Sequence, residues 1–148
     1  MSKRVYRKLG IADLQMLMNT NEDAVAFEMW KVDEESARAF LSSPTNYFFA
    51  CIEDGRIIGY VCGHELSRLD NAGNMLYIHG VGVHASYRKQ GVGKQMMAAV
   101  KQLCKLNGIN KIFLYAHKTN DAACALYDGV GGYAYRDDNV SYVWDKLD

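Results

Sequence analysis

Residues 87–94, which read Tyr-Arg-Lys-Gln-Gly-Val-Gly-Lys, combine cations and glycines in a pattern that suits an anion. Gly91 and Gly93 let the backbone approach a ligand and adopt conformations that a Cβ atom would penalise. A helical pattern follows at once, and the first turn of a helix offers N–H groups that have no intrahelical partner. Together with the three cations, these groups predict a cradle for a phosphate or diphosphate group.

A short motif of this kind has a plain alternative, which is a basic solvated loop before an ordinary helix. Two other phosphate-binding patterns do not fit. A Walker loop has four residues between its glycines and then Lys-Ser/Thr, and a dinucleotide fingerprint has three glycines after the first strand of a βαβ unit.

Cysteine and histidine spacing gives no sign of a metal site or a disulfide framework. No CxxC pair and no HExxH pair occurs. The expected role of the cysteines is that of small, reduced, buried side chains in a cytoplasmic protein. The residues concerned are Cys51, Cys62, Cys104 and Cys124, with His64, His79, His84 and His117.

Length and charge restrict the class of protein. The 148 residues are 49% hydrophobic with one proline, which predicts a single domain over residues 1–148. The 17 Lys and Arg residues balance 17 Asp and Glu residues, so no general positive field is available for nucleic acid. No signal-peptide core and no run of about 18 apolar residues occurs, so no membrane partner is expected.

Hydrophobic periodicity changes along the chain and predicts an α/β (α+β) fold with antiparallel strands at its centre. Asn107-Gly108 is a suitable end for the helix after the cradle. Residues 19–30 show no clear period. The expected strands lie at 5–7, 47–53, 57–66, 75–83, 111–116, 133–135 and 140–144, and the expected helices lie at 11–18, 33–41, 92–106 and 120–127.

With this order of elements, two motifs make the chain resemble the GNAT superfamily of acetyl-CoA-dependent N-acetyltransferases. The Arg/Gln-x-x-Gly-x-Gly/Ala motif of that superfamily is matched within residues 88–93. The Asn-x-x-Ala-x-x-Leu-Tyr-x-x-x-Gly motif is matched at 120–131. The resemblance implies a mixed, mostly antiparallel sheet of about seven strands, about four flanking helices, and a β-bulge where the sheet splays.

The resemblance also implies how acetyl-CoA is held. Backbone amides of the 88–94 loop would bind the diphosphate, and the strand before it would bind the pantetheine as an added strand does. A glycine in Val-Gly-Val would tolerate the bulge. The implied cofactor residues are Val81, Gly82, Val83, Arg88, Lys89, Gln90, Gly91, Val92, Gly93, Lys94, Asn120, Ala123, Leu126 and Tyr127. Asn120 could instead cap its helix.

Catalytic roles follow in the same way. Tyr127 matches the family residue that donates a proton to the departing CoA thiolate. The segment Tyr77–Val83 is similar to the strand of aminoglycoside 3-N-acetyltransferases, but Gly80 stands where they carry an acidic residue. A hairpin centred between residues 71 and 72 would put His64 opposite His79, so His79 is the first candidate base, Glu65 the second and His64 the third.

The expected acceptor is a primary amine, with the 3-amino group of an aminoglycoside first and a peptide or small polyamine as the alternative. Acidic side chains would attract a cationic acceptor; we expect Glu28, Asp137 and Asp138, with His64, near it. A non-catalytic acetyl-CoA sensor is a hypothesis of another class, favoured by Gly80. Exposed strand edges leave a homodimer open.

Overall fold

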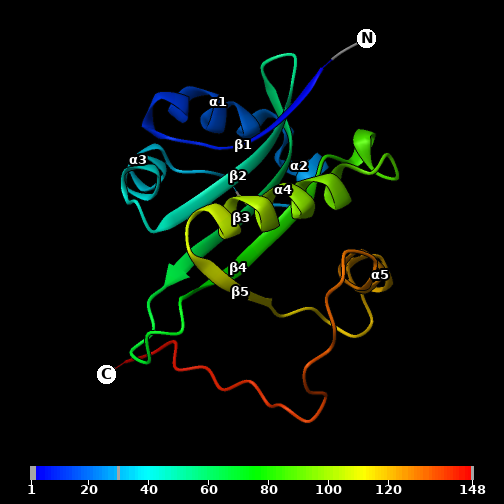
Figure 1. Cartoon of the computed structure of the whole chain (residues 1–148). Helices are drawn as coiled ribbons and strands as arrows, with labels where there is room; N and C mark the ends of the chain where they lie inside the picture. Colours follow the sequence, from blue (N-terminus) through cyan, green and yellow to red (C-terminus); the bar gives the residue numbers. More distant parts are fainter. Residues whose placement is uncertain (1–2, 30, 148) are drawn as a thin grey trace.

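The computed structural model describes residues 3–29 and 31–147. Its centre is a five-stranded sheet in the order β1-β2-β3-β4-β5 (Figure 1). The first four strands pair antiparallel, and β5 pairs parallel to β4. The strands are β1 (Arg4–Lys8), β2 (Asn46–Glu53), β3 (Arg56–Leu66), β4 (Asn74–Val83) and β5 (Ile109–Leu114).

Helices cover the two faces of the sheet unequally. One face packs against α1, α2 and α3, and the other packs against α4, with α5 beside it. No helix among residues 3–29 and 31–147 is long and apolar enough to cross a membrane. The helices are α1 (Leu14–Met18), α2 (Ala24–Phe27), α3 (Glu34–Ser42), α4 (Val92–Leu106) and α5 (Asp121–Gly129), with short 3-10 turns η1 (Ile11–Asp13), η2 (Asn19–Asp23) and η3 (Ala85–Tyr87).

Local sequence explains several of these boundaries. Asp54 and Gly55 both have positive φ, at 51° and 75°, which is the backbone of a two-residue hairpin turn. Asp33 begins α3 by accepting a hydrogen bond from the Ser36 amide at 2.9 Å. Met96 is completely buried on the inner side of α4, while Lys101 is exposed on its outer side.

The expectation of about seven strands is wrong for the described residues, which form five. The expected closing hairpin, 133–135 with 140–144, has no strand in it. The pattern of alternating aromatic and polar residues is typical of a strand, but a strand also needs an edge to pair with. In the described chain, residues 133–147 pair with none, and Figure 1 shows the orange-to-red segment outside the sheet.

The expected bulge is present in β4, although it lies at His79 rather than within Val-Gly-Val. Cys62 pairs with Gly80 and the next residue, Gly63, pairs with Ile78, which leaves His79 as the extra residue. The expected pairing of His64 with His79 is wrong, because His64 pairs with Tyr77. The loop between the two strands is centred one position earlier than expected, and this alone changes the partner of His64, because the bulge lies beyond the Gly63–Ile78 pair.

Candidate active site

β4 has an open backbone edge over its last residues. β5 pairs with β4 only as far as Ile78, opposite Leu114, and in the described part of the chain no strand lies beside residues 79–83 on that side. Val81, Gly82 and Val83 lie in this stretch. Backbone groups that face this open side can pair with an extended amide-bearing ligand, as they would with another strand.

The cradle expected at residues 88–94 is formed by a left-handed turn and the start of α4. Lys89 and Gly91 have φ of 60° and 80°, so the backbone reverses sharply before the helix. The first helical bond runs from the Gln95 amide to the Gly91 carbonyl at 3.0 Å. The amides of the residues between them, 92–94, have no partner within the helix and are free to bind an anion.

Side-chain contacts hold this turn in place. The Arg88 Nε donates to the Val83 carbonyl at 3.2 Å, and its guanidinium lies 3.9 Å from the Glu28 carboxylate. Gln90 donates from Nε2 to the Ser86 carbonyl at 3.3 Å and accepts a bond from Arg4 at 2.6 Å. Arg88 and Gln90 thus position the loop, whereas Lys89 and Lys94 are exposed beside it.

Position 82 needs a glycine because the ring of Tyr60 on β3 leaves no space for a side chain there. A Cβ atom at Gly82 would lie 2.4 Å from Cε1 of Tyr60, the residue with which it pairs. The Tyr60 ring is fixed by stacking on Phe48, with ring centroids 5.5 Å apart. A Cβ atom at Gly80 would lie 3.6 Å from the same ring, which is ordinary contact. Position 80 can therefore take a side chain, and position 82 cannot without moving Tyr60.

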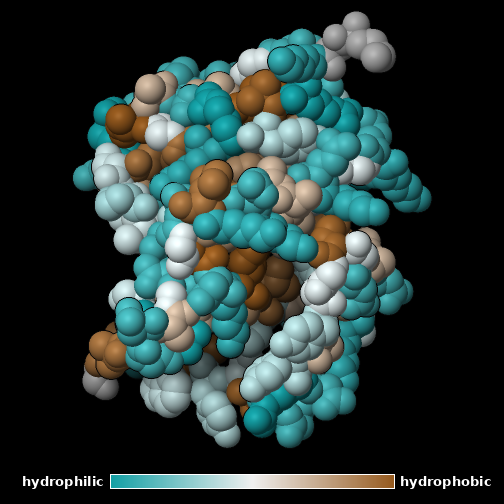
Figure 2. Space-filling model, viewed as in Figure 1, coloured by the Kyte–Doolittle hydropathy of each residue, from teal (hydrophilic) through white to brown (hydrophobic). Residues whose placement is uncertain are grey.

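α5 brings the second motif against the cradle. Leu126 packs on Gly93, where a Cβ atom would come within 3.1 Å of the leucine. Lys101 of α4 donates to the Val130 carbonyl at 2.9 Å, which holds the far end of α5. Figure 2 shows a hollow with a hydrophobic floor between α4 and the segment that carries α5. Ala123 and Tyr127 come from this helix.

Two of the α5 residues have defined local environments. The Asn120 side chain accepts from the Ala123 amide at 3.1 Å, so Asn120 caps the helix, one of the two roles that its position allowed. Tyr127 is partly buried, and this burial, with the nearby Cys124 thiol, raises the pKa of the phenol above its usual value. The phenol therefore keeps its proton at neutral pH.

His79 and His64 lie together on the face that α1–α3 only partly cover. Their ring centroids are 6.3 Å apart, despite the shifted register. The His64 Nδ1 is 3.0 Å from the Asn46 side-chain oxygen, whereas the exposed His79 ring has no hydrogen bond within the described residues. Of the two imidazoles, His79 is therefore the more exposed and His64 the one held by a neighbouring side chain.

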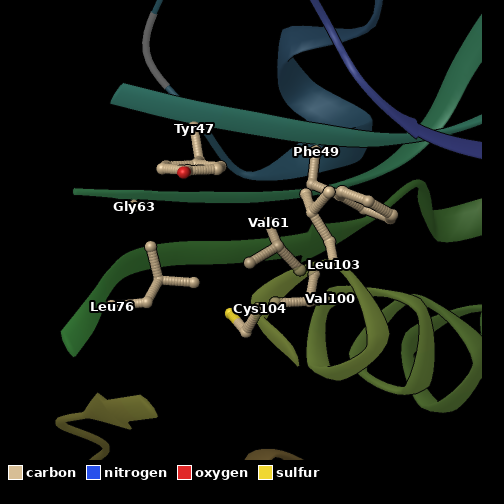
Figure 3. Close-up of a pocket in the computed structure, with 8 residues that line it drawn as sticks. All are labelled: Tyr47, Phe49, Val61, Gly63, Leu76, Val100, Leu103 and Cys104. Atoms are coloured by element: carbon tan, nitrogen blue, oxygen red, sulfur yellow. The ribbon is translucent and has the colours of Figure 1, made fainter. Parts of the chain in front are cut away.

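Glu65 lies on the opposite face, beneath α4. Its carboxylate accepts hydrogen bonds from the Tyr47 hydroxyl at 2.5 Å and from the side-chain Nδ2 of Asn74 at 2.6 Å. Tyr47 belongs to the lining of an apolar pocket under α4, with Val61, Leu76 and Cys104 (Figure 3). Burial and the Glu65 carboxylate raise the Tyr47 pKa. Two short hydrogen bonds occupy Glu65, so its position suits a structural role better than that of a base.

The acidic residues expected near the acceptor are spread apart. Glu28 has a left-handed backbone, with φ of 55°, and faces Arg88. Asp137 and Asp138 are exposed in the C-terminal segment, where Asp137 lies 3.9 Å from Lys118. The structure does not bring these carboxylates together around His79.

An aromatic surface beside His79 was missed in the sequence. Tyr77 stacks on Phe113 of β5, with centroids 5.2 Å apart, and Tyr115 lies edge-on to Tyr77 at 6.1 Å. The His79 ring lies edge-on to the Tyr77 ring, with the two ring centroids 6.4 Å apart. The alternation of Phe113 and Tyr115, at the end of β5 and just after it, was the available signal, but the parallel pairing that brings them to Tyr77 could not be predicted from it.

Comparison with known proteins agrees with this arrangement. Residues 11–131 match the model of the Acetyltransferase (GNAT) family. N-alpha-acetyltransferase RimI of Mycobacterium tuberculosis is 30% identical over 92 residues, which is 62% of this chain and 54% of that protein. The chain spans about half the length of the curated relatives that it matches first.

Solved structures share the fold over nearly the whole chain. The aminoglycoside acetyltransferase meta-AAC0020 from an uncultured soil metagenomic sample, in complex with trehalose, superposes with a TM-score of 0.81 at 23% identity, covering 98% of this chain and 97% of that one. Aminoglycoside N-acetyltransferase AAC(6′)-Iy in complex with CoA superposes with a TM-score of 0.75 at 17% identity, covering 99% of this chain and 97% of that one. With the free α4 amides, the open β4 edge and the family match in agreement, the chain belongs to the GNAT acetyltransferase family, whose members use acetyl-CoA.

Proposed function

We propose that this protein transfers the acetyl group of acetyl-CoA directly to a primary amine, and that the acceptor is a polycationic amine of the aminoglycoside class. One observation carries the proposal. The amides of residues 92–94 at the start of α4 have no intrahelical partner, and β5 pairs with β4 only as far as Ile78, so that the unpaired stretch of β4 begins at His79.

The residues present fit acetyl-CoA. The amides of 92–94, with Lys89 and Lys94, would hold the diphosphate, and Val81–Val83 would hold the pantetheine amides. When bound, acetyl-CoA supplies an activated acetyl thioester. An N–H near Gly82 or Val83 would donate to its carbonyl oxygen and stabilise the negative charge that develops there.

Two side chains would transfer protons during the reaction, one as an acceptor and the other as a donor. An aliphatic ammonium must lose a proton before it can attack, and in this proposal the His79 imidazole accepts it. Tyr127 would donate its phenolic proton to the sulfur of the departing CoA, because a phenol and a thiolate have similar basicity. Direct attack within a ternary complex needs no acyl-enzyme. The Cys124 thiol, which contacts the His117 carbonyl at 3.6 Å, takes no part.

The acceptor class is supported by the rings around His79. Tyr77, Phe113 and Tyr115 present aromatic faces, which attract ammonium groups by cation–π interaction. An aminoglycoside carries several such groups. The likeness of Tyr77–Val83 to the strand of aminoglycoside 3-N-acetyltransferases favours the 3-amino group, whereas the structural neighbour AAC(6′)-Iy is named for another position. Product mapping must decide between the two positions.

A peptide amino terminus is the second candidate acceptor, favoured by the 30% identity to N-alpha-acetyltransferase RimI. A sensor that binds acetyl-CoA without turnover is the candidate of another class. It would use the same cradle and strand edge but would not need Tyr127 or His79.

The test is CoA release by the purified protein with aminoglycosides, polyamines and peptides, followed by mass mapping of the product. We expect acetylation of one aminoglycoside amino group. His79→Gln should lower turnover by about 10²–10⁴-fold with CoA affinity retained, whereas His117→Gln, an exposed histidine, should not. Regioselective acetylation of peptides alone would favour the second acceptor, and CoA binding without turnover on any amine would favour the sensor.

A further inference from the structure

His84 lies at the junction between β4 and the loop that leads to α4. Its amide donates to the Ile58 carbonyl at 2.9 Å, one residue beyond the end of β4. Its side-chain Nδ1 accepts a hydrogen bond from the Ser86 amide at 3.1 Å. A bond from a side chain to the amide two residues later is the one that Asn and Asp make in turns. The His84 side chain therefore helps to set the direction in which the chain leaves the strand.

The other ring nitrogen of His84 faces a carboxylate from a distant part of the sequence. Because Nδ1 accepts, the proton of the neutral ring lies on Nε2, which is 3.5 Å from Oδ1 of Asp23. Both side chains are largely buried, at 15% and 20% exposed. The ring also lies edge-on to Phe27 and to Tyr87, with centroids 5.4 Å and 5.5 Å apart. Residues of η2 and α2 thus hold the ring from one side.

Asp23 has no local role that would account for its position. It immediately precedes α2, where an aspartate usually caps the helix, but within the described residues its carboxylate accepts no capping bond. Instead, Oδ2 accepts from the Arg56 guanidinium at 2.7 Å, while Oδ1 faces His84. The carboxylate is therefore directed at the junction after β4 rather than at its own helix.

Packing alone does not fix the His84 ring. An open cavity of about 240 Å³ adjoins it, lined in part by Asp23, Ser86 and Tyr87. The ring has space to turn into this cavity, and a side chain with free space settles in whichever rotamer its contacts favour. The contact with Asp23 is the one that joins the ring to the rest of the domain on its Nε2 side.

We propose that Asp23 is a positioning residue for acetyl-CoA and that it acts through His84. The inference rests on the proposed function, which puts the pantetheine beside Val83 and the diphosphate at the amides of 92–94. These two parts of the cofactor are joined covalently, so the strand and the loop must keep one relative position to bind both. His84 directly follows Val83 and turns the chain towards the loop, and Asp23 holds the His84 ring. This role needs no contact between Asp23 and the cofactor.

The first measurement is the affinity for CoA by calorimetric titration. We expect Asp23→Ala to raise the Kd for CoA about tenfold, because a loop that is less preorganised must be ordered at the expense of binding energy. The matched control is Asp13→Ala. It removes a carboxylate that is similarly buried and also paired with an arginine at 2.7 Å, but its partners are Arg7 and Gly10. This control should leave the Kd unchanged.

The second measurement asks whether Asp23 acts through His84. His84→Asn should raise the Kd as much as Asp23→Ala does, because asparagine can still accept the bond from the Ser86 amide but is too short to reach Asp23. His84→Ala loses both contacts and should raise the Kd further. Asp23→Ala combined with His84→Asn should bind CoA no more weakly than His84→Asn alone, since both changes break the same contact.

The outcomes separate this inference from the proposed function. A wild-type protein that binds CoA, with a folded Asp23→Ala variant that binds it equally well, would overturn the inference alone. Additive effects of the two changes, or an equal loss of affinity in Asp13→Ala, would do the same. An unchanged Kd in His84→Asn would overturn it even if Asp23→Ala does not fold. A wild-type protein that does not bind CoA would overturn the proposed function and, with it, this inference.

Discussion

At the scale of single residues, Tyr127 is the side chain whose role in the proposed chemistry can be tested most directly. We expect Tyr127→Phe to lower kcat by about 10²–10⁴-fold and to leave CoA affinity nearly unchanged, because only the proton donor is removed. Since burial raises the pKa of the phenol, the donor form persists through neutral pH, and any loss of rate from its ionisation lies on the alkaline side. A stopped assay of product formation measures kcat, and calorimetric titration with CoA measures the affinity. An unchanged kcat would remove Tyr127 from the mechanism.

Gly82 and Gly80 lie near the same Tyr60 ring, so alanine substitutions at the two positions can be compared directly. Gly82→Ala puts a methyl group 2.4 Å from Tyr60, so the ring or the strand must move, at a cost of about 1–3 kcal/mol. Gly80→Ala meets the same ring at 3.6 Å and should change the free energy of unfolding far less. Urea denaturation of the two variants gives the comparison. Equal losses of stability would show that the ring adapts freely.

Glu65 separates a structural role from a catalytic one. Glu65→Gln weakens the bonds from Tyr47 and Asn74, each to a charged group, and we expect a loss of about 1–3 kcal/mol in the free energy of unfolding. Turnover per folded molecule should remain close to that of the wild type. A large fall in kcat without a loss of stability would instead make Glu65 the base.

At the scale of elements, Arg7 and Asp13 join β1 to η1. Their side chains pair at 2.7 Å, and Asp13 also accepts from the Gly10 amide at 2.8 Å. The hydrogen bond from the Arg7 guanidinium is the main cause that lowers the pKa of the Asp13 carboxyl. Because the folded-state pKa is the lower one, this stabilisation is complete above the unfolded value of about 3.9 and is lost as the pH falls through the folded value.

Asp13→Asn should therefore cost ~1 kcal/mol at neutral pH, a modest figure because Arg7 is partly exposed. The difference between variant and wild type should disappear at strongly acidic pH. Urea unfolding at a series of pH values measures it. A difference that stays constant down to pH ~2 would rule out the ion pair as its source.

The elements that sequence could predict are those whose signals are local. The Asp54-Gly55 turn fixes the β2–β3 register through residues that adopt positive φ. The cradle is likewise local, since Gly91 and the start of α4 adjoin in sequence. The β3–β4 register was out of reach, because the polar loop before β4 has no signal that fixes its centre, and the extra residue at His79 has no local signature either. The prediction of two strands within 133–147 was wrong because composition indicates a strand but does not show whether an edge is available for it, and in the described chain this segment pairs with none.

At the scale of the whole molecule, stability is distributed unevenly around the sheet. Two buried clusters, one under α4 and one under α1–α3, share β2 and β3 as their common wall. In contrast, α5 contains no buried residue and contacts α4 mainly through Leu126 and Lys101. The part of the proposed site that bears Tyr127 thus belongs to the least anchored helix.

Amide hydrogen exchange should show this difference. We expect α5 amides to exchange well before those of α4 and of the β2–β3 hairpin, because a helix with few buried contacts opens at low cost. Saturating CoA should slow exchange in α5 selectively, since a ligand that binds between α4 and α5 opposes that opening. Uniform protection across α4 and α5 without ligand would contradict the uneven stability.

The contact between Tyr60 and Gly82 also restricts how this sequence can change over generations. A side chain at position 82 is accessible only after residue 60 has become smaller, because the reverse order passes through a clash at 2.4 Å. The effect of either substitution thus depends on the other. A mutational path that reaches position 82, on the strand that is proposed to hold the thioester, must begin at residue 60 on the neighbouring strand.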